Sequence, residues 1–558
     1  MGGGDRRADR GRALATLPGV PGRSAGRLPG ALPGAAGQAG AAVPLPVARR
    51  RRAHRHRRAG ERRPRPRPSP AARGRGRAVR SGEGVHADRG GAERAQRGVA
   101  PGVRRRRIRT GGRGHDAAQD GRVDGVSALS GGPAPVVTPV FDLVGIGFGP
   151  SNLALAIALA EEGSPALSTV FLEKQEAFGW HRGMLIEGTT MQVSFLKDLV
   201  TMRNPASPYS FVSYLHAKGR LADFINQKSM YPTRVEFHDY LEWVAARFER
   251  QVRYGTEVVT IRPVEADGEI RELDIVVQSG DLTTYRARNV VLAAGLRPVL
   301  PAGVVAGERV WHSQELMCRL RDLPEQRPHR FVVVGAGQSA AEVVEHLHSR
   351  FPAAQVCAVF SRYGFSPADD SPFANGVFDP AAVDRFYDAP HDVKRMIMDY
   401  HANTNYSVVD LGLLHDLYGR AYREKVTGVE RLRVMNLSRA VGLETRSDGV
   451  NVHVESLATG EVEALRADVV VYATGYRPVD PLDLLGAAGQ LCLRDERGDL
   501  LVGRDHRVRT GPETSCGIYL QGATEHTHGL TSTLLSTTAV RAGEIVDSLA
   551  SAVLEPAR

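Results

Sequence analysis

The chain has few cysteines and no long apolar run. The four cysteines stand far apart and form no Cys-x-x-Cys pair (Cys318, Cys357, Cys492 and Cys516). This spacing argues against a disulfide scaffold, a zinc site and a dithiol redox centre. No apolar stretch approaches the ~20 residues of a membrane span, and no segment has the layout of a signal peptide. We therefore expect a soluble cytoplasmic protein with no membrane partner.

Residues 1–140 contain no aromatic residue and no lysine. They hold 31 Arg and 9 acidic residues, a net charge of +22, which leaves a net −11 for the rest of a chain whose total is +11. A segment dominated by Arg, Gly, Pro and Ala cannot bury enough apolar surface to offset its chain entropy, so 1–138 is predicted to be a disordered extension. Its basic runs could bind nucleic acid nonspecifically. For the folded part we expect no nucleic-acid partner.

The start of the chain has a second interpretation. The next methionine after Met1 is Met184, well inside the region predicted to fold. Arginine without lysine also fits G+C-rich DNA read upstream of a true start, so we interpret 1–138 as a mis-assigned start. We expect a chain that begins near Val136 to fold, bind its ligands and work normally.

The stretch 141–173 has the pattern of a dinucleotide-binding unit. A strand at 141–144 leads through three glycines into a helix that Gly163 is placed to end, and 170–172 is predicted as a second, parallel strand. Glycines let the backbone approach a pyrophosphate, which binds to free N–H groups at a helix N-terminus. Glu173, at the end of the second strand, can accept both ribose hydroxyls. The glycine spacing is one residue short, and a glycine-rich turn without a ligand is the alternative.

A second unit of the same kind begins at 331, with Gly335, Gly337 and Ala340 at the close-approach positions. The number of residues between Gly335 and the turn at Thr474 and Gly475 is similar to the number between the first glycine loop and the turn that ends the first unit. One unit inserted in the other explains this repeat better than one large sheet. We predict an α/β fold of two Rossmann-like domains with a small substrate-binding region. Residues 139–327 and 466–558 form the first domain and 328–465 the second.

Two nucleotide sites in one chain suggest a flavin and a nicotinamide that face each other. Arg362 lies past the next strand of the second unit, where a cation can hold the 2′-phosphate of NADP. No acidic residue occupies that strand end, so we expect NADPH rather than NADH. The alternative for Arg362 is a solvated surface arginine.

Three further stretches, 192–204, 369–380 and 403–407, carry a resemblance to a known family. With them the sequence resembles the microbial L-ornithine N5-monooxygenases, flavin-dependent N-hydroxylating monooxygenases of siderophore biosynthesis. The resemblance covers about 141–549. The first glycine loop of that family has the same short Gly-x-Gly-x-Gly-Pro-Ser-Asn form, which accounts for the unusual spacing here.

The resemblance implies FAD and NADPH as cofactors and L-ornithine and O2 as substrates. NADPH would reduce FAD, O2 would add at flavin C4a, and the resulting hydroperoxide would hydroxylate the neutral side-chain amine. The product would be N5-hydroxy-L-ornithine, a hydroxamate precursor. No protein residue is implied as catalytic, because the flavin carries the chemistry. Related enzymes often form tetramers, so a homotetramer is possible.

The resemblance, together with the repeat, also implies site residues. Those for the flavin and the nicotinamide entrance are Gly145, Gly147, Gly149, Pro150, Ser151, Glu173, Trp180, His181, Met191 and Gln192. Those for NADPH and the second glycine unit are Arg234, Gly335, Gly337, Gln338, Ser339, Arg362, Tyr406, Thr474 and Gly475. Those for the substrate and the C-terminal closure are Lys197, Asn375, Asn405, Leu534 and Ser536. Gly376 departs from the family, in which an acidic residue commonly follows the asparagine.

Other interpretations stay open at this point. Lys197 could be a solvated lysine, and Asn375 and Asn405 could merely cap turns. Glu525–His528 invites a metal site, but two histidines at i, i+2 without further ligands are weak, so we predict no metal. The rival functions are an L-lysine N6-hydroxylase, a Baeyer–Villiger or sulfur-oxidising flavin monooxygenase, and a non-catalytic flavin-binding module.

Overall fold

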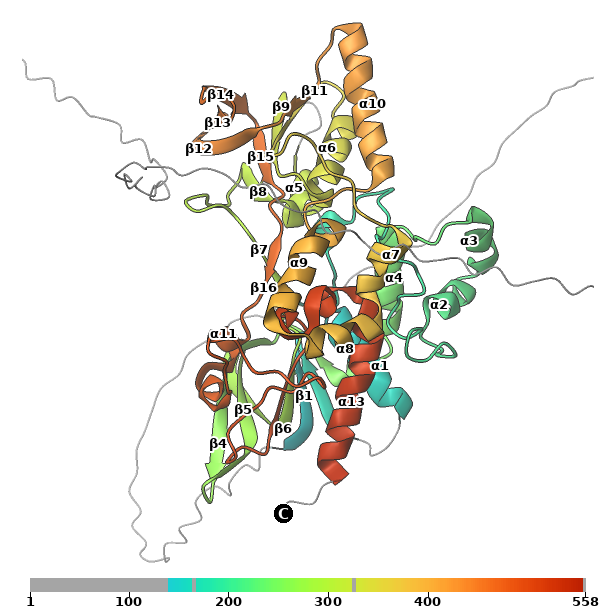
Figure 1. The fold of residues 1–558 in the computed structure, drawn as a ribbon, viewed down its shortest axis with the longest axis vertical. Helices are drawn as coiled ribbons and strands as arrows, with labels where there is room; N and C mark the ends of the chain where they lie inside the picture. Colours follow the sequence, from blue (N-terminus) through green and yellow to red (C-terminus); the bar gives the residue numbers. More distant parts are fainter. Residues whose placement is uncertain (1–138, 163–166, 324–327, 555–558) are drawn as a thin grey trace, which may run out of the picture. The chain divides into compact units, whose positions relative to one another are not determined.

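A computed structural model describes residues 139–162, 167–323 and 328–554 (Figure 1). The predicted extension 1–138 and the predicted helix end at Gly163 lie outside these described residues. Both predicted dinucleotide-binding units fall within them, and each unit has its own main sheet.

The first sheet has the strand order β3-β2-β1-β6-β5-β4, and β17 also pairs with β6. Its parallel part is built from β1 (Val140–Ile146), β2 (Thr169–Leu172), β3 (Val252–Arg253), β6 (Asp281–Leu292) and β17 (Gly517–Leu520). The antiparallel strands β4 (Glu257–Ala266) and β5 (Glu269–Ser279) extend it at one edge. The predicted strands at 141–144 and 170–172 are confirmed, and they are parallel.

Helices cover this sheet through their apolar faces. Helix α1 (Pro150–Glu162) packs on the C-terminal helix α13 (Thr538–Leu554), and Leu153 and Ile157 share one buried cluster with Ile545. Helix α4 (Arg234–Ala245) begins after Thr233, whose hydroxyl caps it by accepting the Glu236 N–H at 3.2 Å. The same cluster includes residues of α2 (Phe211–Ala217) and α3 (Leu221–Gln227).

The second sheet is parallel, with the order β11-β10-β9-β15-β8. Its strands are β8 (Val310–His312), β9 (Arg330–Val334), β10 (Gln355–Val359), β11 (Leu432–Met435) and β15 (Val469–Tyr472). The helices packed with it are α5 (Leu316–Leu320), α6 (Gln338–Arg350) and α10 (Leu411–Thr427). A separate antiparallel sheet contains β12 (Ser438–Arg446), β13 (Gly449–Ser456) and β14 (Val462–Ala467).

The predicted domain boundaries at 328 and 466 differ from this arrangement. Strand β8 precedes the first boundary and β15 follows the second, yet both pair within the second sheet. A three-residue strand carries little sequence signal, and a fully buried apolar run such as β15 suits either sheet equally well. Pairing partners, which sequence does not give, decide the assignment.

Two short strands connect the domains. Strand β7 (Leu296–Pro298) leaves the first sheet, and β16 (Tyr476–Pro478) returns from the second. They pair antiparallel, and the Val299 N–H donates to the Gly475 carbonyl at 3.0 Å. The second domain is therefore an insertion whose entry and exit lie side by side (Figure 1).

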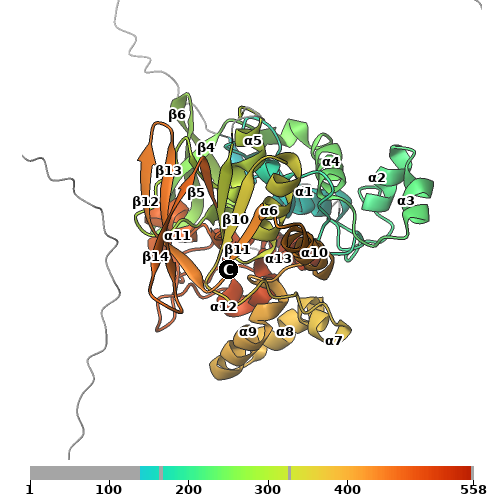
Figure 2. The ribbon, with the colours of Figure 1, turned by 90° about the horizontal axis from the view of Figure 1, so that it is seen from above.

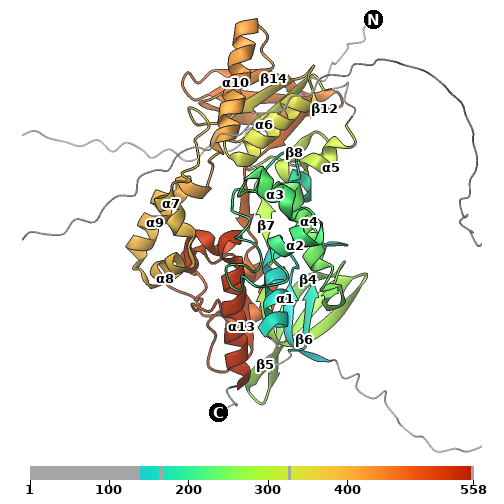
Figure 3. The same ribbon diagram turned by 90° about the vertical axis from the view of Figure 1, so that its right-hand side faces the viewer.

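A group of three helices follows β10: α7 (Pro372–Asn375), α8 (Pro380–Asp388) and α9 (His391–Asn405). They lie on the side of α12 (Glu525–His528) and α13, as Figures 2 and 3 show. The remaining helix is α11 (Pro481–Leu485), and short 3₁₀ turns cover 182–184, 249–251, 313–315, 376–378, 486–491, 529–533 and 535–537. Two of the predicted substrate residues, Asn375 and Asn405, stand in this helical group.

Candidate functional site

The first glycine loop leaves the N-terminus of α1 open. Gly147 has φ +81°, and a Cβ there would lie 2.5 Å from the Ala293 carbonyl oxygen. A Cβ on Gly149 would instead point into open space, and no acidic residue occupies the first turn of α1. Free N–H groups, an open approach and no competing carboxylate suit a bound phosphate. Asn152, which ends the Gly-x-Gly-x-Gly-Pro-Ser-Asn motif but was not among the predicted site residues, fixes this loop by donating to the Gly147 carbonyl at 2.7 Å.

Glu173 stands at the end of β2, beside this loop. Its side chain is buried; one oxygen accepts the Phe148 N–H at 2.7 Å and the other accepts the Gln175 N–H at 2.8 Å. Each carboxylate oxygen can accept a further hydrogen bond. The geometry therefore leaves both oxygens able to accept ribose hydroxyls, as predicted for this residue.

Two buried side chains near the first turn of α1 had no signal in the sequence. The Gln521 amide donates to Asn152 Oδ1 at 2.9 Å, while its own oxygen is buried without a partner among the described residues. Arg541 is fully buried, donates to the Ser532 carbonyl at 2.7 Å, and burial lowers its pKa to about 10. A buried unpaired acceptor and a buried cation fit a ligand rich in hydroxyls and negative charge, so the residues present suit FAD.

The second glycine loop repeats the first. Gly335 has φ +146°, and a Cβ there would lie 2.4 Å from the Ala473 carbonyl oxygen and 3.2 Å from the Ala340 Cβ. Gly337 precedes α6, whose first turn holds Ser339 and no acidic residue. At the end turn of this domain the Thr474 hydroxyl donates to the Val299 carbonyl, and Gly475 has φ +83°.

Arg362 is exposed beyond the end of β10, where the sequence places it. Its guanidinium donates to the Ser407 carbonyl at 2.8 Å, so it lies beside the segment that carries Asn405 and Tyr406. The Tyr406 hydroxyl donates to the Glu525 carboxylate, and burial together with that carboxylate raises the pKa of Tyr406. These contacts bring Arg362, Tyr406 and the C-terminal segment into one region.

Arg234, which the resemblance assigns to NADPH, forms an ion pair within the protein. Its guanidinium forms two parallel hydrogen bonds with the buried Glu342 carboxylate of α6, at 2.7 and 2.9 Å, and a third with the Met184 carbonyl at 3.1 Å. Gln338 donates to the same carboxylate at 3.0 Å. Glu342 was not among the predicted site residues, since a glutamate inside a helix carries no motif of its own.

The residues expected around the flavin ring come from one loop. His181 has φ +48°, its ring meets Trp180 edge-on at 4.7 Å, and it lies 5.9 Å from the Tyr476 ring of β16. Met191 is buried and its N–H donates to the Pro232 carbonyl at 2.9 Å, whereas Gln192 is exposed. The loop thus reaches from α4 to the connecting strands.

Lys197 is half-buried, and its ammonium group has no polar partner within the part of the chain that the structure describes. Its neighbour Asp198 is buried and holds the local backbone by accepting the Thr201 and Phe211 N–H groups, each at 2.7 Å. Burial raises the pKa of Asp198. A fixed backbone with an available ammonium group suits recognition of a carboxylate.

The other predicted substrate residues lie on the helical group and the C-terminal turns. Asn375 ends α7 and donates to the Asp370 carbonyl at 2.9 Å, while Asn405 ends α9. Helix α9 packs against α7 and the turn 529–533, and Ser536 is buried in the turn that follows Leu534. The structure thus gathers these segments, but within the described residues no side-chain hydrogen bond or ion pair joins Lys197 to them.

The histidines of 525–528 make contacts within the protein. His526 bonds the Leu500 carbonyl at 2.9 Å, and His528 stacks on His506 with ring centroids 4.1 Å apart. Burial and the neighbouring His506 lower the pKa of His528 to about 3. Over the described ranges no group of three or more His, Cys, Asp or Glu side chains could hold a metal ion. No helix in those ranges is long and apolar enough to span a membrane.

Comparison with known proteins gives consistent matches. The family model for L-lysine 6-monooxygenase/L-ornithine 5-monooxygenase matches residues 139–478. The L-ornithine N(5)-monooxygenase of Pseudomonas aeruginosa is 39% identical over 426 residues, covering 75% of this chain and 95% of that protein. The ornithine N-hydroxylase of Kutzneria sp. 744, solved with reduced FAD, NADP+ and L-ornithine, is 48% identical with a TM-score of 0.72, covering 74% of this chain and 99% of that one. The L-lysine 6-monooxygenase of Pseudomonas syringae is 33% identical with a TM-score of 0.66, covering 74% and 100%.

Proposed function

Because the chain belongs to the family of L-lysine 6-monooxygenases and L-ornithine 5-monooxygenases, we propose that it hydroxylates the side-chain amine of L-ornithine with NADPH and O2. The product is N5-hydroxy-L-ornithine, a hydroxamate precursor for a siderophore. The observation that carries the choice of substrate is the 48% identity to an ornithine N-hydroxylase over nearly all of that enzyme, against 33% to a lysine monooxygenase of equal coverage.

The two dinucleotide domains hold the two cofactors. FAD binds in the first domain at the α1 loop and Glu173, and NADPH binds in the second at the α6 loop and Arg362. Bound FAD would supply the redox chemistry, namely hydride acceptance from NADPH and activation of O2. The protein contributes binding, orientation and exclusion of water, which limits the loss of oxidant as hydrogen peroxide.

The substrate is held as an α-amino acid. Lys197 supplies a cation for the ornithine carboxylate, and Asn375 and Asn405 supply amide groups for its backbone end. Ser536 and Leu534 close the site from the C-terminal side. The reacting amine must be neutral, although the pKa of a free alkylamine is ~10.4, so the pocket has to favour deprotonation through desolvation.

The decisive experiment counts hydroxylated product per NADPH oxidised with ornithine, lysine and putrescine. Ornithine should give coupled turnover. Lysine carries one more methylene, which moves its amine past the reacting position and should leave mostly hydrogen peroxide. Putrescine lacks the carboxylate that Lys197 recognises and should not be hydroxylated. Equal or better coupling with lysine would overturn the ornithine assignment in favour of the lysine hydroxylase, the strongest rival.

The assembly and the location of the enzyme are separate proposals. Helix α10 exposes Leu411, Tyr418, Tyr422 and Val426, whose spacing puts them on one face with exposed fractions of 56–77%. This face supports self-association, for which we propose a homotetramer in the cytoplasm, without nucleic acid. Sedimentation of the parent and of Tyr418→Glu/Tyr422→Glu tests the assembly, since two buried carboxylates should dissociate it. An unchanged mass in the variant would exclude this face.

A further inference from the structure

We propose that Glu342 is a positioning residue for NADPH, which holds Arg234 and Gln338 in the orientation that the coenzyme requires. This inference rests on the proposed function for the identity of the ligand. It concerns a residue that makes no contact of its own with the coenzyme and acts through two others. Its geometry is a carboxylate on α6 that meets a guanidinium from α4.

The contacts of Glu342 are short and enclosed. Its two oxygens accept from the two terminal nitrogens of Arg234 at 2.7 and 2.9 Å, and one of them also accepts from the Gln338 amide at 3.0 Å. The side chains of Arg234 and Glu342 are only 13% and 3% exposed. A buried carboxylate with three charge-assisted or amide donors has little freedom to move.

The outer ends of the network are fixed as well. Arg234 donates to the Met184 carbonyl at 3.1 Å, and the Gln338 oxygen accepts the Asp410 N–H at 2.8 Å. The network around this carboxylate therefore links four segments: the loop after His181, the start of α4, the first turns of α6, and the start of α10. Loss of the carboxylate frees two long side chains at once.

Arg234 and Gln338 both keep N–H donors that the protein does not use. A guanidinium has five N–H donors, and Arg234 uses three of them within the protein. Gln338 has two amide donors and uses one. The network thus leaves donors on both side chains while it neutralises the Glu342 charge, so an anionic coenzyme meets fixed donors and no free carboxylate.

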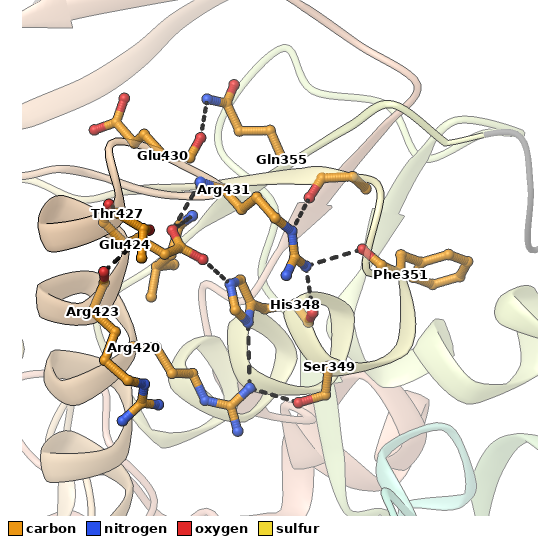
Figure 4. Close-up of polar contacts among 12 residues, drawn as sticks. His348, Ser349, Phe351, Gln355, Arg420, Arg423, Glu424, Thr427, Glu430 and Arg431 are labelled. Atoms are coloured by element: carbon orange, nitrogen blue, oxygen red, sulfur yellow. Dashed lines mark hydrogen bonds and ion pairs between the residues drawn. The ribbon is translucent and has the colours of Figure 1, made fainter.

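Glu424 provides a matched control in the same domain (Figure 4). Its carboxylate also has three hydrogen-bond partners. It bonds His348 Nε2 at 2.7 Å and accepts the Arg431 and Leu432 N–H groups at 2.8 and 2.6 Å. It ties α10 to α6 and β11 but touches none of the residues assigned to NADPH. Its removal loosens the domain without altering Arg234 or Gln338.

The test measures equilibrium binding of NADP+ to the FAD-loaded protein by calorimetry, in the parent, Glu342→Gln and Glu424→Gln. We expect Glu342→Gln to weaken NADP+ binding about tenfold or more, with FAD content unchanged. Glu424→Gln should lower the melting temperature and leave NADP+ affinity within about twofold of the parent. Unchanged affinity in Glu342→Gln, or an equal loss in Glu424→Gln, would overturn the proposal.

A second variant guards against misfolding, because Glu342→Gln leaves a buried guanidinium without its partner. In Arg234→Gln/Glu342→Gln no charge is stranded. If Glu342 acts through Arg234 and Gln338, the double variant should lose less NADP+ affinity than the product of the losses in Arg234→Gln and Glu342→Gln, whereas independent effects would multiply and would contradict the proposal. The binding assay needs no hydroxylation. Failure of the parent to hydroxylate ornithine therefore bears on the proposed function and not on Glu342.

Discussion

Lys197 is the residue on which substrate recognition depends most in our proposal, and its half-buried ammonium group is available to a carboxylate. We expect Lys197→Ala to weaken ornithine use strongly while reduction of FAD by NADPH stays close to that of the parent. A loss of about 1.5–3 kcal/mol is expected for one charge-assisted contact. Rapid-mixing measurement of flavin reduction, together with product per NADPH, separates the two effects. Slower flavin reduction in the variant would show that Lys197 serves the nicotinamide instead.

Arg362 gives a second prediction at the same scale. Arg362→Ala should lower kcat/KM for NADPH by an amount that corresponds to a loss of about 1.5–3 kcal/mol in transition-state stabilisation. The change for NADH should be smaller, because only NADPH carries the 2′-phosphate. FAD content should not change. The comparison of kcat/KM for the two coenzymes measures this. If NADPH kinetics stay unchanged, another cation holds the phosphate, and Arg234 is the first to examine.

Some residues of the candidate site could be predicted from the sequence, and others could not. Glu173 was predictable, because the end of a second strand is a defined position in a known pattern. Glu342, Gln521 and Arg541 were not, since each becomes part of the site only through contacts with residues far along the chain, namely Arg234, Asn152 and Ser151. The roles of Asn375 and Asn405 came from a family resemblance, and their backbone environments now show helix ends that can present an amide.

At the scale of elements, the attachment of α8 depends on charge. Arg504 joins Asp384 of α8 at 2.7 Å to Glu544 of α13 at 2.8 Å, and His506 also contacts Glu544 at 3.1 Å. The hydrogen bonds from His506 and Arg504 outweigh the effect of burial and lower the pKa of Glu544 to about 2, from an ordinary value of 4.5. Helix α8 follows directly on the segment that carries Asn375.

The sign of the resulting pH dependence follows from that shift. A depressed carboxylate pKa contributes stability that is fully present above the ordinary value of 4.5 and is lost as pH falls toward about 2. The contribution is about 3 kcal/mol at most. Glu544→Gln should therefore reduce stability above pH ~5 and flatten its acid dependence between pH ~5 and ~2. Urea unfolding at several pH values checks this. Parallel curves for parent and variant would contradict it.

Elements differed in how well the sequence predicted them. Strands followed by glycine turns were located well, because apolar runs and obligatory glycines act over a few residues. Strand β11 carries a weaker pattern, because it lies parallel to β10 at the sheet edge and its exposure differs along its length. The helices after Asn375 carry mixed polarity, since α9 exposes Met396 and Tyr400. Their existence depends on contacts with α12 and the 529–533 turn.

For the whole molecule, we expect the paired connection of β7 and β16 to determine how the nicotinamide can approach the flavin. Insertion of two glycines between Pro298 and Val299 should break the Val299–Gly475 hydrogen bond and shift the register. We expect FAD content and NADP+ affinity to persist while anaerobic flavin reduction slows about tenfold or more, since orientation is lost and binding is kept.

The control for this experiment is the same insertion after Gly460, in the exposed turn between β13 and β14. It lengthens the chain by an equal amount without touching the connection. Flavin reduction at the parental rate in the Pro298 insertion, or an equal slowing in the Gly460 insertion, would show that the paired strands do not set the geometry.

The antiparallel pair also bears on how the chain reaches its native state. Strand β17 must pair with β6 across more than two hundred residues, a separation that makes loop closure slow. Once the inserted domain folds, the Val299–Gly475 hydrogen bond holds its two ends together. The effective loop between β6 and β17 then contains only the residues outside the insertion. Folding of the inner domain thereby shortens the search of the outer one.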